Sequence, residues 1–220
     1  MVNPRIGIKY SPVPDLALKA SWGEYSQFLY TINQEDELLR IVDFWQPIPE
    51  GGKPQQSEHF IIGSEYWISE GNIFSVEAYV KDYSNIYDLN PKVEGSDIEG
   101  TIALSGIGRS YGLELMYRLK KDKISGWISY AYSRIKREVD LNSDGIIWQS
   151  KEIYPAKYDK PHSFNSVLSY QLSEKHEIGL STIFSSGQTY TPVVGKVHQA
   201  GSQSYGSLEN PYHYFGNIYG

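Results

Sequence analysis

Residues 109–134, RSYGLELMYRLKKDKISGWISYAYSR, decide how this chain folds. From residue 111 to residue 119, every second side chain is apolar or aromatic, and those between are mostly polar or glycine. The apolar set is Tyr111, Leu113, Leu115, Tyr117 and Leu119, and the opposite side carries Ser110, Gly112, Glu114 and Arg118. A polar break follows at 120–123, and the alternation resumes after it. Because a period of two belongs to a β-strand and not to a helix, the stretch predicts a β-hairpin with one apolar and one polar face.

The hairpin pattern recurs along the rest of the chain. Alternating segments are predicted at 5–10, 16–25, 58–68, 73–83, 109–119, 124–134, 163–172 and 176–185. Short polar breaks at 11–15, 70–72, 120–123 and 173–175 join them in pairs, and long polar gaps rich in Gly and Pro separate the pairs at 27–57, 84–108, 135–161 and 186–220. We therefore predict an all-β fold, the antiparallel wall of a transmembrane β-barrel with about eight long strands, short periplasmic turns and long extracellular loops.

Strand length supports a membrane-spanning sheet. Ten residues at about 3.3 Å each, tilted by about 40°, cover roughly 25 Å, the height of the apolar band of an outer-membrane barrel. The polar sides carry charges of both signs, which need contact with water. A β-sandwich also alternates, but its loops are commonly short at both ends. The third segment is the least regular, because Ile61 and Trp67 fall on its polar side.

Composition restricts the classes of function. The net charge of −6 and the scattered Lys and Arg residues argue against a nucleic-acid partner, which needs clustered cations. Without cysteine, the chain has no disulfide framework and no cysteine metal site. A mean hydropathy of −0.44 is compatible with a barrel, because only alternate residues of a strand face lipid. The first five residues do not begin a signal peptide, so either the chain is an internal fragment of an exported protein or the membrane interpretation is wrong.

Several segments resemble strands of the TonB-dependent outer-membrane receptors. Residues 3–10 (NPRIGIKY) and 18–27 (LKASWGEYSQ) are similar to a barrel hairpin of that family, which reads Pro-Arg-x-Gly-x-x-Tyr and then a Leu-Lys-Ala-Ser-Tyr-Gly-like strand. Residues 110–115 (SYGLEL) resemble its Ser-x-Gly-Leu-Glu-Leu strand, and residues 127–133 (WISYAYS) resemble the strand after it. Residues 158–165 (YDKPHSFN) and 185–192 (SSGQTYTP) resemble a loop re-entry and a Ser-Gly-x-Pro-Tyr-Thr exit.

The resemblance covers nearly the whole chain and implies part of a larger barrel. Because the family barrel has 22 strands, residues 1–220 are expected to supply about a third of the wall, from its C-terminal half, without the plug domain, the TonB box or the final strands. The family's function implies that external loops capture a bulky nutrient such as a siderophore, cobalamin or oligosaccharide. A TonB-type energy-transducing complex would then pull on the plug. The implied location is the outer membrane with its lipid, and neither catalysis nor a cofactor is expected.

Charged and aromatic residues supply the candidate sites. Glu77, Lys81, Glu114 and Arg118 are candidates for the lumen, where they line the substrate path and hold the plug, or only solvate the inner face through cross-strand pairs. Aromatic residues in the long loops are candidates for ligand contacts, because ring faces stack on sugars and flat chelates, although they can equally pack the loops together. These aromatic candidates are Trp45, Tyr87, Trp148, Tyr205, Tyr212 and Tyr214.

Two other patterns are weaker. Asp140, Asn142 and Asp144 have the spacing of the first half of a calcium-binding loop, but Lys151 stands where the loop needs Glu, so a polar turn is the favoured interpretation and no metal is expected. Asp159 and His162 have the residue types of an acid/base pair. No nucleophile motif accompanies them, so a structural hydrogen bond at a loop entry is the favoured interpretation.

Two alternatives to the receptor remain open from the sequence. One is a complete, small eight-stranded outer-membrane barrel with an adhesive or structural role. The other is a soluble all-β carbohydrate-binding module. The membrane interpretation requires that Val76, Val80, Leu113 and Leu115 are not enclosed in a compact core.

Overall fold

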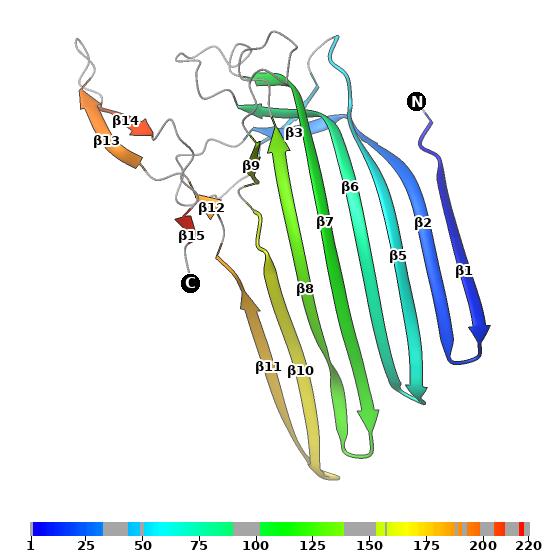
Figure 1. The fold of residues 1–220 in the computed structure, drawn as a ribbon. Helices are drawn as coiled ribbons and strands as arrows, with labels where there is room; N and C mark the ends of the chain where they lie inside the picture. The colour runs from blue at the N-terminus through cyan, green and yellow to red at the C-terminus, as the bar shows by residue number, and fades with distance from the viewer. Residues whose placement is uncertain are drawn as a thin grey trace.

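The computed structural model describes residues 2–32, 44–48, 51–89, 102–138, 153–156, 158–187, 189–190, 193–198, 205–209 and 216–217. All regular elements in these residues are β-strands (Figure 1). Their bounds are β1 Arg5–Val13, β2 Leu16–Gln27, β3 Leu29–Ile32, β4 Phe44–Pro47, β5 Gln55–Ser69, β6 Asn72–Leu89, β7 Ile102–Lys121, β8 Ile124–Glu138, β9 Ile153–Pro155, β10 His162–Ser173, β11 His176–Ser185, β12 Thr189–Tyr190, β13 Val193–His198, β14 Tyr205–Glu209 and β15 Gly216–Asn217. Among the described residues, no helix is long and apolar enough to cross a membrane.

Eight long strands form one antiparallel sheet in the order β1-β2-β5-β6-β7-β8-β10-β11, and the short β9 pairs with the end of β8. The four tight turns of the predicted hairpins lie at one end of this sheet, and the long connections leave from the other end (Figure 1). Within the described part of the chain the sheet does not close, because β1 and β11 form its two edges. The prediction of a partial barrel wall with eight long strands is confirmed.

The predicted bounds of all four long loops are wrong. In the predicted loop at 135–161, β8 continues to Glu138 and the short β9 pairs with it. The strands β6 and β7, of 18 and 20 residues, continue well past the predicted ends at 83 and 109. Ser84 and Asn85 have a loop composition, but Asn85 adopts φ 53° at a register shift, so the two residues form a β-bulge inside a continuing ribbon. The predicted loop at 27–57 contains the β3–β4 pair, and the gap after residue 186 contains the pairs β12–β15 and β13–β14.

Cross-strand register places most of the large apolar side chains of the eight long strands on one side of the sheet, with Ile61, Trp67, Trp127, Val167 and Ile183 among the exceptions. One row across six strands contains Ile8, Ala20, Ile62, Ala78, Leu113 and Tyr132. We call the side that carries this row the apolar face. The neighbouring row, on the opposite side, contains Lys19, Gly63, Glu77, Glu114 and Ala131, and we call that side the polar face. A slip by one residue would exchange the two faces, so the alternation strongly specifies register.

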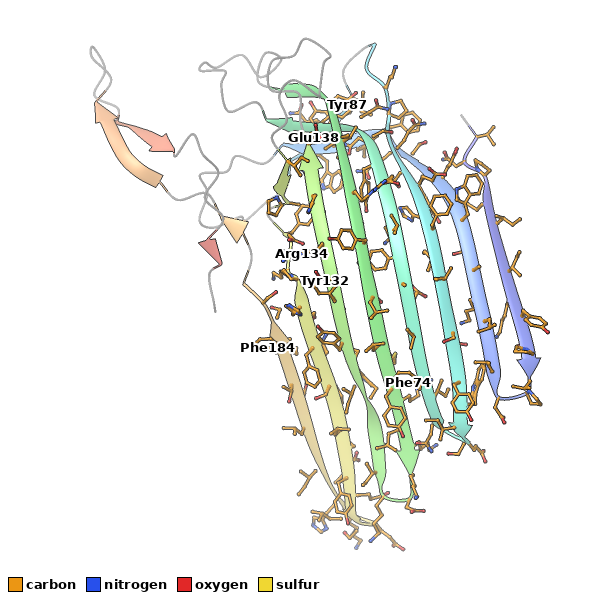
Figure 2. All side chains as sticks on the ribbon, viewed as in Figure 1. Phe74, Tyr87, Tyr132, Arg134, Glu138 and Phe184 are labelled. Atoms are coloured by element: carbon orange, nitrogen blue, oxygen red, sulfur yellow. The ribbon has the colours of Figure 1, made fainter. Side chains whose placement is uncertain are left out.

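Nothing in the described part of the chain covers the apolar face. Ile62 is 64% exposed, Leu180 is 61% exposed and Phe184 is 60% exposed, and large side chains project from the sheet without a second layer packed on them (Figure 2). Val80 and Leu113 are each 38% exposed, while Val76 and Leu115 are partly covered by their neighbours in the sheet. A compact two-layer core is therefore absent from the described sheet.

Candidate functional site

The four predicted charged residues share the polar face, but only two of them are neighbours. Glu77 on β6 lies directly opposite Glu114 on β7. The ammonium group of Lys81 lies 4.6 Å from the centre of the Tyr79 ring. Arg118 lies nearer the turn end, in register with Ile73 and Trp127. Like charges directly opposite on a sheet repel each other, so the Glu77–Glu114 pair is a local destabilising feature that suits a cationic partner.

Other contacts on the polar face join β1, β2 and β5. Lys19 Nζ lies 2.5 Å from Glu65 Oε1, and their side chains are 42% and 29% exposed. Lys9 Nζ lies 5.7 Å from the centre of the Trp67 ring. This cation–π contact gives a physical reason for the large aromatic residue that interrupts the alternation of the third predicted segment.

A cluster of rings lies toward the connection end of the polar face. The His59 ring lies 4.4 Å from the Tyr25 ring and 6.5 Å from the Tyr83 ring, measured between centroids. The Arg5 guanidinium covers Tyr25 at 4.2 Å, and Ser57 Oγ lies 3.0 Å from His59 Nε2. No local sequence motif predicts this cluster, because its members come from different strands.

A cavity of about 270 Å³ lies beside this ring cluster. Its lining includes the amides of Gln27, Gln55 and Gln56, with Tyr83 and Arg137. Arg137 also lies over the ring of Tyr158, with 5.3 Å between its Cζ and the ring centroid. Amides, hydroxyls and a guanidinium around a cavity can form directional hydrogen bonds with a polar ligand.

Five of the six aromatic candidates, all except Tyr87, fall into three groups. Trp45 lies on β4 and is 58% exposed, so its ring is accessible to a ligand. The backbone of Tyr205 begins β14. Trp148, Tyr212 and Tyr214 lie outside the described residues, as do the weak calcium candidates Asp140, Asn142 and Asp144.

Tyr87 corrects the expectation for its position. It lies on β6 and not in a loop, it is only 6% exposed, and its ring stacks on Tyr30 with 5.1 Å between centroids. Its hydroxyl donates to the Lys53 carbonyl at 2.6 Å, and burial raises the pKa of both tyrosines. Asn85 Nδ2 donates to the Pro54 carbonyl at 3.1 Å. Because β5 pairs with β6, the segment before β5 lies beside the extension of β6. The hydrogen bond of Tyr87 thus anchors that segment to β6.

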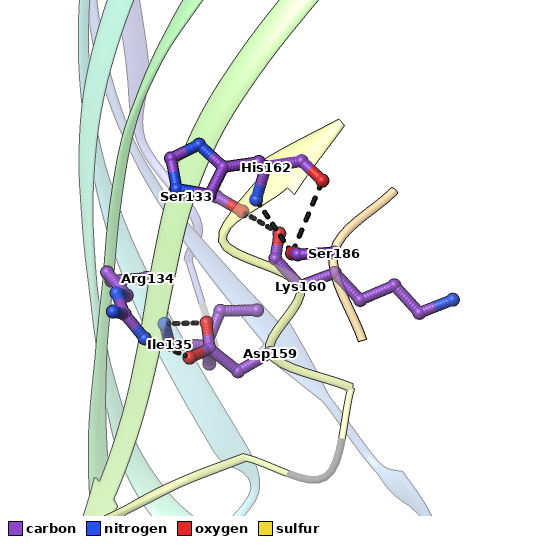
Figure 3. A network of polar contacts seen from close by, with 7 residues as sticks. All are labelled: Ser133, Arg134, Ile135, Asp159, Lys160, His162 and Ser186. Atoms are coloured by element: carbon purple, nitrogen blue, oxygen red, sulfur yellow. Dashed lines mark hydrogen bonds and ion pairs between the residues drawn. The ribbon is translucent and has the colours of Figure 1, made fainter. Parts of the chain in front are cut away.

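Asp159 and His162 have separate structural roles (Figure 3). Asp159 is 1% exposed; its Oδ1 accepts a hydrogen bond from the Ile135 amide at 2.9 Å, and its Oδ2 lies 3.2 Å from Arg134 Nη1. The His162 amide donates to Ser186 Oγ at 2.9 Å, and its Nδ1 lies 2.8 Å from Tyr130 Oη. These contacts agree with the favoured structural interpretation. On one edge β8 pairs with β10 as far as Tyr132 and with β9 from Lys136 onward. Between the two pairings, the Asp159 carboxylate accepts the hydrogen bond that a carbonyl of a neighbouring strand would otherwise accept. In the described segments, no cluster of His, Cys, Asp or Glu is arranged to hold a metal ion.

Long antiparallel strands, tight turns at one end, and an uncovered apolar face opposite a charged one define the wall of a transmembrane β-barrel. The chain matches the family described as TonB dependent receptor-like, beta-barrel, over residues 1–217, and it belongs to that family. Members of the family are receptors and transporters of the outer membrane and not enzymes. The resemblance found in the strand motifs is therefore confirmed. No curated protein matches the chain.

Proposed function

We propose that this chain forms part of the barrel wall and external loops of an outer-membrane receptor that imports a bulky nutrient with energy from a TonB-type complex. The observation that carries the proposal is the uncovered apolar face across eight paired strands. An apolar patch of this extent is unfavourable in water, whereas lipid solvates it without cost. The uncovered face does not favour a soluble carbohydrate-binding module, and the open sheet edges do not favour a small closed barrel.

The outward residues of β7 support the membrane assignment. From the turn end upward, this strand presents Lys121, Leu119, Tyr117, Leu115, Leu113, Tyr111 and Arg109 on the apolar face. At a tilt of about 40°, the distance from Lys121 to Arg109 corresponds to roughly 30 Å of height, slightly more than the apolar band of an outer membrane. Tyrosine rings stand near both ends of the band, where amphipathic rings prefer the interface, and cations flank it.

In the proposed arrangement, the polar face of the sheet lines the lumen of the barrel. Neither Glu77 nor Glu114 forms an ion pair with another described residue, although they lie opposite each other. Such a pair attracts a cationic surface, which supports contact with an occluding plug. Lys81 and Arg118 would contact water or substrate along the same face. The cavity beside Tyr83 and the exposed Trp45 would contact the nutrient at the external end, with Trp148, Tyr205, Tyr212 and Tyr214 as further candidates.

Site-specific quenching tests the membrane assignment. Because the chain contains no cysteine, Leu113→Cys and Glu114→Cys each give one labelling site for a bimane fluorophore. In liposomes with brominated lipid, we expect strong quenching at residue 113 and weak quenching at residue 114. Equal quenching at the two positions, or protein that remains in the aqueous fraction, would overturn the assignment.

Energised uptake tests the transport role. Cells that express the full-length protein are offered a ferric siderophore, cobalamin and an oligosaccharide in parallel, with and without a protonophore. We expect accumulation of one nutrient class that depends on the protein and stops when the protonophore is added. Accumulation that persists with the protonophore would contradict the TonB-type mechanism.

A further inference from the structure

A row of charged side chains lies on the apolar face, directly beyond its last aromatic residues. On β7, Arg109 follows Tyr111 at the next outward position, and on β6 Asp82 follows Val80. Cross-strand register aligns Glu24, Glu58, Asp82, Arg109 and Lys136 in this row. The row therefore belongs to the apolar face, at the end from which the long connections leave.

The two signs of charge are segregated along the row. The strands β2, β5 and β6 contribute carboxylates, whereas β7 and β8 contribute Arg109 and Lys136. Glu58 Oε1 accepts a hydrogen bond from Trp22 Nε1 at 2.7 Å, which directs this carboxylate toward the row below. The basic half forms an outward-facing positive patch on two adjacent strands.

Existing contacts leave the basic half open to a further anion. Arg109 Nε and Nη2 donate to the two carboxylate oxygens of Asp82, at 2.5 and 3.1 Å, and its side chain is still 64% exposed. Because Nε and Nη2 of Arg109 contact Asp82, the third guanidinium nitrogen, Nη1, does not contact that carboxylate. Lys136 is exposed and forms no ion pair with another described residue. Arg134, in the row below, is instead bound to the buried Asp159.

We propose that Arg109 and Lys136 bind a phosphate group of a phosphorylated lipid in the outer leaflet. The inference rests on the proposed function, because it requires the apolar face to lie in the membrane. Tyr111 then marks the interface on β7, and Tyr132 lies one row further into the band on β8. Arg109 and Lys136 form the row directly beyond Tyr111 and Arg134, at the level of the headgroups. Guanidinium and ammonium groups bind phosphate through charge-assisted hydrogen bonds, and their stems extend along the apolar surface below them. The lipid's acyl chains lie against Leu113 and Leu115, which favours a lipid over a free anion.

Binding of bisphosphorylated lipid A to the full-length protein in phosphatidylcholine nanodiscs tests this proposal. We compare the wild type with Lys136→Gln and with the double variant Arg109→Gln/Lys136→Gln. A cation near a membrane surface contributes about 1 kcal/mol, so we expect roughly fivefold weaker binding for each cation removed. Lys123→Gln, in the β7–β8 turn at the other end of the strands, is the matched control and should bind as the wild type does.

The outcomes separate the two proposals. Equal affinity of the wild type for lipid A and for lipid A without phosphates would overturn the phosphate site, as would unchanged affinity in the double variant. Complete displacement of lipid A by inorganic phosphate would assign the patch to a free anion and overturn the lipid as its source. If brominated lipid still quenches a bimane at Leu113→Cys, none of these results contradicts the membrane assignment. Loss of that quenching would overturn the proposed function itself.

Discussion

The two faces of the sheet share one backbone but are held in order by different interactions. The polar face has directional contacts between named groups, such as Lys19 with Glu65 and His59 with Tyr25. Leu113 and Leu180 on the apolar face have side chains that can make only non-directional contacts, and they are 38% and 61% exposed. The difference indicates that contacts between residues of the chain order the side chains of the polar face. The stability of the apolar face depends instead on the solvent that covers it.

The difference between the two faces holds only as far as the row of charged residues that contains Asp82 and Arg109. Beyond Asp82 and Arg109, both faces meet water in the proposed arrangement, and packing of rings and buried polar bonds replaces lipid as the source of order. Tyr30, on β3, and Tyr87, on the extension of β6 past Asp82, are 4% and 6% exposed. Variants on the two faces and in this outer region therefore test the comparison separately.

The largest expected effect comes from a charge on the apolar face. Leu115→Arg should lower the free energy of unfolding in liposomes by about 2–4 kcal/mol, because a cation near the middle of the bilayer loses its hydration. The matched control is Glu114→Arg, the neighbouring residue on the polar face, which should change stability by less than about 1 kcal/mol, since that site stays hydrated. Urea titration followed by tryptophan fluorescence measures both. Similar losses at the two positions would break the distinction between the faces.

Glycine substitution compares the faces at the backbone. Gly126, on the apolar face of β8, has φ +154°, and an added Cβ would lie 2.1 Å from the Val167 carbonyl oxygen of β10. We expect Gly126→Ala to destabilise the sheet by about 2 kcal/mol, because β8 and β10 must separate. Gly179, on the polar face of β11, has its nearest contact at 3.9 Å, so Gly179→Ala should have little effect. The denaturant midpoints of the two variants are compared. Equal midpoints would show that β8 can accommodate the added Cβ without loss of stability.

Asp159 tests the polar bonds at the end of β8. Asp159→Ala removes the acceptor for the buried Ile135 amide and the partner of Arg134, which should cost about 1–3 kcal/mol locally. Asp159→Asn retains an acceptor oxygen and should lose less. Hydrogen exchange at the Ile135 amide reads out the effect at its site. If exchange is as slow in the alanine variant as in the wild type, water or another acceptor has replaced the carboxylate.

The smallest expected effect is a pH dependence of the Tyr30–Tyr87 stack. Burial is the first cause of the raised pKa of both tyrosines, so the folded state favours their neutral forms. The stabilisation they provide is complete below the ordinary tyrosine pKa of about 10 and is lost as pH rises through the higher folded-state values. Hydrogen exchange at the amides of residues 51–53 should therefore accelerate above that pH. The same acceleration in the double variant Tyr30→Phe/Tyr87→Phe would assign it to another group.

The strand class, the positions of the four turns and the assignment of side chains to two faces follow from the amino-acid order alone. Alternation with a period of two decides which face each residue occupies, and the turns decide which strands are neighbours. The shared face of Glu77, Lys81, Glu114 and Arg118 could therefore be predicted from residue parity alone.

Which residues meet across strands is known only from the three-dimensional arrangement of the strands. Parity specifies register only to within steps of two residues, so it predicts that Glu77 and Glu114 share a face but not that they lie opposite each other. The stack of Tyr87 on Tyr30 depends on the bulge at Asn85, and the bond of Asp159 to the Ile135 amide depends on where β10 leaves β8. These contacts join residues far apart in the chain, and their geometry follows from strand offset and twist, for which a local pattern carries no signal.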